Sequence, residues 1–143
     1  MSLYFVMLLT HIITAVLLIA TVLFADHKAL LWVLGKKDTL PKEIMHRVHR
    51  GMYIGLGIMI LSGIYLFLPL RAYLLYEPAF QAKMGFLLAL LLNSLLIGKL
   101  LSIATTQTFT TLPRRTQLLF LVSGGVSVIS WIGVIVAANL TSV

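Results

Sequence analysis

The stretch LYFVMLLTHIITAVLLIATVLFA, residues 3–25, decides the fold because it is apolar throughout and carries one ionisable side chain, His11. An α-helix rises about 1.5 Å per residue, so a run of this length crosses a hydrocarbon core of about 30 Å. The run has no basic residue in front of it and exceeds the apolar core of a cleavable signal peptide. We therefore expect residues 3–25 to form a retained membrane-spanning helix.

Three further runs have the same character, at about residues 48–70, 80–103 and 118–140. The chain is 60% hydrophobic and only 10% charged, with a mean hydropathy of +1.05, whereas soluble domains are about 25% charged. The four prolines fall outside the cores of these runs, and Pro69 and Pro78 flank the second. Residues 1–143 are therefore predicted to be a single transmembrane domain. Short connections between neighbouring spans predict an all-α, integral membrane, antiparallel four-helix bundle.

Basic residues are concentrated in the first and third connections between the predicted spans. The positive-inside rule places those two connections in the cytoplasm and both termini outside. Topology and anionic headgroups then account for the net charge of +7, so we expect a lipid bilayer as partner and no nucleic acid. The amphipathic residues 30–34 are expected to continue the first helix, with Gly35 ending it, or to lie at the interface. Trp32 fits an aromatic belt at the membrane surface.

Two ionisable residues lie at comparable depth in the predicted bundle, His11 and Lys83. An ionisable side chain in hydrocarbon is costly, which favours a functional role. A neutral His11 imidazole suits an axial haem ligand or a proton relay, and the alternative is an interhelical hydrogen bond. Lys83 is expected either to face the bundle, where it would bind a carboxylate or donate a proton, or to extend to the headgroups.

Small and aromatic residues offer two further candidates for cofactor contact. Gly51 and Gly55 form a GxxxG pattern, which is typical of close helix packing and would also admit a flat cofactor such as a porphyrin. Trp131 lies well inside the fourth span, where it either fills the core or packs on a ring cofactor. Asn93, in the third span, is expected to form an interhelical hydrogen bond.

A second polar group is predicted near the cytoplasmic ends of the first two spans: Asp26, His27, His46 and His49. His46 and His49 are three residues apart and share one helical face. Three imidazoles and a carboxylate suit zinc or copper, so a metal site is one interpretation. Anchoring at the interface and helix capping are the other. The absence of cysteine excludes thiolate ligands.

Two segments carry a resemblance to a known family. The start THIITAVLL and the third run FQAKMGFLLALLLNSLL, in a chain of four predicted helices, resemble the HemJ-type protoporphyrinogen oxidases and the wider CopD-like group of small four-helix membrane proteins. In the HemJ family a histidine in helix one and a lysine in helix three are essential, and a b-type haem is bound. The resemblance thus implies that His11 and Lys83 form the functional pair and that haem b is the cofactor.

The leading expectation is a haem b-binding membrane protein with redox or porphyrin-oxidising activity, in a bacterial inner membrane. Two alternatives stay open at this point. One is a non-catalytic accessory or assembly subunit, acting as a homo-oligomer or within a larger membrane complex. The other is metal-ion handling at the Asp26, His27, His46 and His49 group. The sequence contains no GxSxG, P-loop or HExxH pattern, which disfavours hydrolase and nucleotide chemistry.

Overall fold

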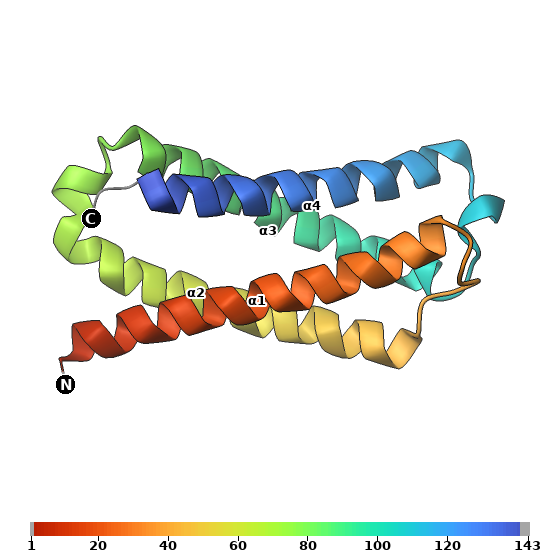
Figure 1. Cartoon of the computed structure of the whole chain (residues 1–143), viewed down its shortest axis with the longest axis horizontal. Coiled ribbons are helices and arrows are strands. Elements are labelled where there is room, and N and C mark those ends of the chain that lie inside the picture. Colours follow the sequence, from red (N-terminus) through yellow and green to blue (C-terminus); the bar gives the residue numbers. More distant parts are fainter. Residues whose placement is uncertain (1, 141–143) are drawn as a thin grey trace.

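The computed structural model describes residues 2–140 and is built from four long helices (Figure 1). These are α1 (Leu3–Val33), α2 (Lys42–Leu74), α3 (Pro78–Ala104) and α4 (Arg114–Leu140), with a 3-10 turn η1 (Phe109–Thr111) before α4. All four are long and apolar enough to cross a membrane. The predicted all-α membrane bundle is confirmed; residues 1 and 141–143 of the predicted domain lie outside the described range.

The helices extend beyond the apolar runs that predicted them. α1 continues to Val33, and Gly35 follows with a φ of 71°, a left-handed conformation that favours glycine. The predicted extension of the first helix is therefore confirmed. Pro78 starts α3, as expected, whereas Pro69 lies inside α2, which continues to Leu74. The prediction that Pro69 lies outside the helix was wrong.

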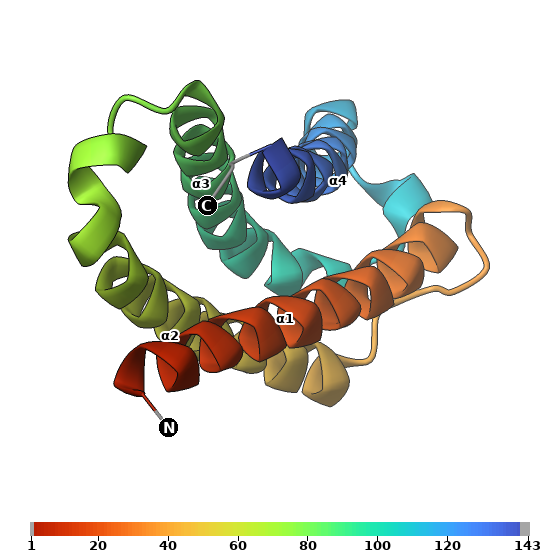
Figure 2. The same ribbon diagram turned by 60° about the vertical axis from the view of Figure 1, so that its left-hand side comes forward.

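The four helices form two antiparallel pairs. α1 packs along α2 and α3 packs along α4, while contacts between the pairs are sparse. Figures 1 and 2 show that the pairs converge at one end and diverge toward the other. The converging end holds the α1–α2 and α3–α4 connections and most of the lysines and arginines; we call it the basic end. The start of α1, the end of α4 and the α2–α3 connection lie at the opposite end (Figure 1).

Two apolar clusters join the pairs. The basic-end cluster comprises Trp32, Leu40, Met45, Leu101, Ala104, Phe109 and Leu112. The central cluster comprises Leu18, Val22, Leu56, Met59, Leu90 and Trp131. In the first, Trp32 is fully buried, donates from Nε1 to the Gln107 carbonyl at 3.0 Å and meets Phe109 and Phe120 edge-on. The assignment of Trp32 to an interfacial belt was therefore wrong.

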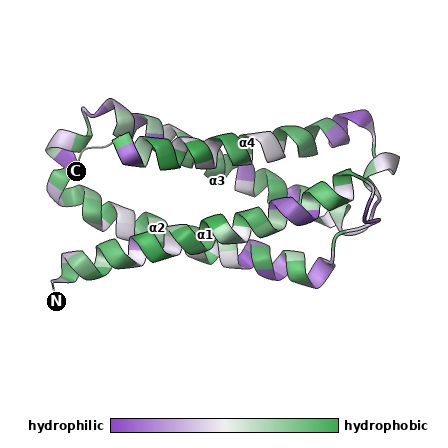
Figure 3. Ribbon diagram, viewed as in Figure 1, coloured by the Kyte–Doolittle hydropathy of each residue, from purple (hydrophilic) through white to green (hydrophobic). Residues whose placement is uncertain are grey.

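Hydrophobic residues make up most of the length of the four helices (Figure 3), and many large ones are exposed. Large side chains point outward there, with Leu61 71% exposed and Ile129 64% exposed. Such a surface is stable in hydrocarbon and is not that of a water-soluble monomer. The chain is therefore an integral membrane protein with the lipid bilayer as its surroundings.

Candidate functional site

His11 lies in the third turn of α1 and bonds across to α2. Its Nδ1 is 3.1 Å from the Met59 carbonyl oxygen and 2.9 Å from the Ser62 hydroxyl. A carbonyl oxygen only accepts, so the contact with Met59 assigns the ring proton to Nδ1. The Ser62 hydroxyl donates to its own helix, at 2.8 Å from the Ile58 carbonyl oxygen. Ser62 Oγ is therefore free to accept from His11 as well.

This arrangement leaves the other ring nitrogen of His11 as an acceptor. Within residues 2–140, Nε2 has no hydrogen-bond partner, and the side chain is half-buried. The edge of the ring lies against α2 at Gly63, where an added Cβ would stand 3.3 Å from Cε1. A histidine whose Nδ1–H is held by a backbone carbonyl presents Nε2 in a fixed direction, as metal-ligating histidines do.

Lys83 is the charged group that acts on this imidazole. It lies in the second turn of α3, is half-buried, and is close enough for its charge to influence the His11 ring. In the described part of the chain its ammonium forms no ion pair or hydrogen bond. The charge of Lys83 on α3 thus acts on the His11 ring on α1, without a hydrogen bond between the two side chains among residues 2–140.

The two other candidates for cofactor contact serve helix packing. An added Cβ on Gly55 would lie 2.7 Å from Leu18 Cδ2, so the small residue makes room for a leucine of α1. Trp131 is 8% exposed and belongs to the central cluster. Leu18 fills the space beside Gly55, and the cavity that Trp131 lines holds only about 20 Å³. The bundle therefore accounts for Gly55 and Trp131 without a cofactor.

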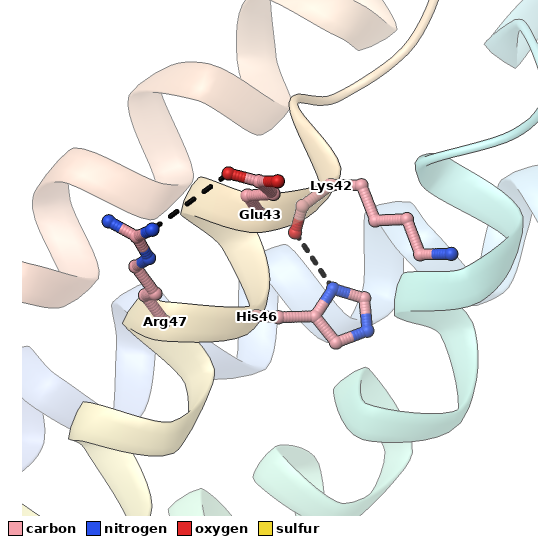
Figure 4. Close-up of polar contacts among 4 residues, drawn as sticks. All are labelled: Lys42, Glu43, His46 and Arg47. Atoms are coloured by element: carbon pink, nitrogen blue, oxygen red, sulfur yellow. Dashed lines mark hydrogen bonds and ion pairs between the residues drawn. The ribbon is translucent and has the colours of Figure 1, made fainter.

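The polar group predicted as a metal site is not assembled. His46 is exposed, and its Nδ1 lies 2.8 Å from the Lys42 carbonyl oxygen of its own helix, beside an exposed Glu43–Arg47 ion pair (Figure 4). His27 is also exposed. No three His, Asp or Glu residues between positions 2 and 140 come together as ligands. The metal interpretation is not supported by this geometry.

Asp26 and His49 face inward, and both line a cavity of about 120 Å³ between the helix pairs. The metal, anchoring and capping interpretations of Asp26 did not include a cavity, so this cavity was not predicted from the sequence. A signal was present: Val22, Asp26 and Ala29 recur at helical spacing on one face of α1, and all three line the cavity.

A buried hydrogen-bonded pair joins α3 to α4. Asn93 Nδ2 donates to the Ser123 carbonyl at 3.0 Å, and Ser123 Oγ donates to Asn93 Oδ1 at 2.8 Å. The interhelical bond predicted for Asn93 is confirmed. Its reciprocal form satisfies both polar side chains, which hydrocarbon would otherwise leave unpaired.

Comparison with known proteins returned no matching protein family, no matching curated protein and no matching solved structure.

Proposed function

We propose that the chain is a haem b-binding membrane protein with redox or porphyrin-oxidising activity, in which His11 is the axial ligand. The observation that carries the proposal is the fixed imidazole: Nδ1 is bonded to Met59 and Ser62, and Nε2 is unpaired. Iron binds neutral imidazole nitrogen of this kind. The resemblance to HemJ-type proteins supports the same residue.

The donor set fits a haem in two respects. His11 offers one nitrogen ligand, and Lys83 offers an ammonium that can pair with a propionate carboxylate. The cavities found in the described residues hold about 20 and 120 Å³ and are not lined by His11. His11 and Lys83, and not the lining of these cavities, are therefore the residues that would hold a haem.

The residues of this chain would perform three tasks. Ser62 and Met59 hold the imidazole in one tautomer, which keeps Nε2 aimed at a ligand. Lys83 balances acidic groups of the bound molecule or transfers a proton. The apolar helix faces exclude water and so keep electrostatic interactions strong. A bound haem would supply the electron-accepting centre.

We also propose an orientation of the chain in the membrane. The basic end of the bundle faces the cytoplasm, since nine of the eleven lysines and arginines lie toward it. The start of α1 and the end of α4 then face the opposite side of a bacterial inner membrane. Support comes from the charge distribution and the family resemblance.

Haem quantification tests the proposal. Wild type expressed with supplied haem precursor should purify with a Soret band and near-stoichiometric haem, and His11→Ala should lose most of it. His27→Ala is the matched control, because His27 is an exposed histidine on the same helix. A wild-type protein without a Soret band, or equal haem in His11→Ala, contradicts the proposal. Co-purification of larger membrane proteins with haem-free wild type would favour the accessory-subunit alternative.

A further inference from the structure

A cavity of about 120 Å³ lies inside the half of the bundle nearer the basic end. All four helices line it, and Leu40, Met45 and Ala104 of the basic-end cluster close it on one side. Its polar lining consists of Asp26 from α1, His49 from α2, and Ser123 and Ser127 from α4. The cavity is distinct from the His11 site, which lies toward the opposite end of α1.

Among the residues that the structure describes, 2–140, Asp26 and His49 are the only ionisable ones that line this cavity. Asp26 of α1 and Ser127 of α4 line the same cavity. His49 packs edge-on against Tyr53 with ring centroids 4.6 Å apart, and its Nε2 lies against α3 at Gly98. α3 contributes only apolar side chains to the lining. His46, on the same helix as His49, is the other charged or titratable group that acts on His49.

The size and polarity of the cavity indicate that it holds water. Apolar cavities stay dry, whereas a cavity with several polar groups takes up water at about 30 Å³ per molecule. About four waters fit here by that measure. A smaller cavity of about 20 Å³ shares Met52, Ile97 and Ser127 with it and adds Asn93 and Ser94. The polar lining therefore continues toward the middle of the bundle.

The depth of the cavity puts it within reach of bulk water. Asp26 and His49 each precede an exposed basic residue, His27 and Arg50, and Lys99 is exposed beside the α3 wall. Charged side chains on the outside of the helices mark the level of the headgroups. The cavity therefore lies near the membrane surface and not at the bilayer centre.

We propose that Asp26, His49 and Ser127 form a hydrated proton-exchange site. A proton from the aqueous phase at the basic end is relayed by the cavity waters and binds either the Asp26 carboxylate or the neutral His49 imidazole. When protonated Asp26 gives this proton through the waters to neutral His49, or His49 returns it, the net charge of the pair does not change. Ser127 holds the carboxylate toward the cavity. The site does not depend on haem at His11.

The reactivity of introduced cysteines tests whether the cavity contains water. The chain has no native cysteine, so each introduced cysteine is the only thiol in its variant. Positions 127 and 128 are adjacent on α4, but Ser127 lines the cavity, whereas Val128 is 49% exposed on the lipid side. Methanethiosulfonate ethylammonium is added to membranes from the side that labels Lys36→Cys. Ser127→Cys should react at least about tenfold faster than Val128→Cys, because thiolate forms in water and not in lipid. Equal rates would overturn the proposal.

Infrared spectroscopy tests whether the Asp26 carboxyl group binds and releases a proton. Wild type should show a carboxylic acid C=O band that titrates with pH and shifts in D₂O, and isosteric Asp26→Asn should lack it. Ser127→Ala should keep the band and move its midpoint, since Ser127 is a polar residue in the lining of the same cavity as Asp26. A band that ignores pH, that persists in Asp26→Asn, or that depends on Na⁺ or K⁺ at fixed pH would overturn the proposal. Helicity and elution volume equal to wild type establish that each variant is folded.

Discussion

At the scale of the residue, the sequence identified His11 as a candidate site residue but did not identify the residues that it bonds to. Its depth in an apolar run identified it, because an imidazole there needs a partner. The partners, Met59 and Ser62, are 48 and 51 positions away in the chain. Which turn of α2 meets His11 depends on how the two helices rotate and slide, and hydropathy does not encode that. Lys83 was identified by depth as well, and its charge is the one that acts on the His11 ring.

Replacing Ser62 with alanine tests the bond that holds the imidazole. Ser62→Ala removes an acceptor of His11 Nδ1 and leaves Met59 as the remaining one. The free energy of unfolding should fall by about 0.6 kcal/mol and by no more than about 1.7 kcal/mol, the average and the maximum measured for interhelical hydrogen bonds in a membrane protein. Reversible unfolding in mixed micelles measures it.

Ser102→Ala is the control for this experiment. Ser102 is exposed, and its hydroxyl bonds only within its own helix, to the Lys99 carbonyl at 3.3 Å. Its replacement should change the unfolding free energy by less than about 0.5 kcal/mol. Equal losses in Ser62→Ala and Ser102→Ala would show that the His11–Ser62 bond contributes nothing to stability.

At the scale of the element, helix number and approximate position followed from apolar runs, whereas helix ends and neighbours did not. Trp32 illustrates the difference: its place at the end of a run predicted a surface belt, and the structure buries it completely. The cause is the segment around η1, whose Phe109 and Gln107 carbonyl receive the indole. A contact across 75 positions between the last turn of α1 and an irregular segment has no periodic signature in the sequence.

Gly133 lies at the α3–α4 interface, where a larger side chain would meet Phe86. An added Cβ on Gly133 would lie 2.5 Å from the Phe86 ring, so Gly133→Ala forces that ring or the helices to move. We expect a loss of about 1 to 3 kcal/mol, the usual cost of overpacking. Phe86→Leu should recover part of the loss in a double-mutant cycle, since the two residues are in contact.

Gly125→Ala is the control on the same helix. Nothing lies within 4 Å of a Cβ at Gly125, so the variant should match wild type or gain up to about 1 kcal/mol from helix propensity. Thermal unfolding of the purified variants compares the two positions. Similar destabilisation at both positions would contradict the close contact with Phe86.

At the scale of the whole molecule, the bundle is two helix pairs joined by two apolar clusters. The sequence predicted the number of helices and their alternating direction. It did not predict that the pairs diverge, because that angle follows from side-chain volumes at the interface. The cavity with Asp26 and His49 arises from the same packing, and for that reason it was not foreseen.

Labelling of single cysteines tests the proposed orientation. Lys36→Cys lies at the basic end, and Tyr76→Cys lies in the α2–α3 connection, where the native side chain is 83% exposed. In intact cells a membrane-impermeant maleimide should label Tyr76→Cys at once and Lys36→Cys only after permeabilisation. The charge asymmetry of the connections is the reason. The reverse pattern would place the basic end outside.

The pairing of α1 with α2 and of α3 with α4 has a consequence for how the protein is made. Each pair is contiguous in the chain, so the first hairpin is complete before the second leaves the ribosome. His11 then finds Met59 and Ser62 within the first half alone. An imidazole that would be costly to leave unpaired in the lipid is thus satisfied early, while the second half is still being synthesised.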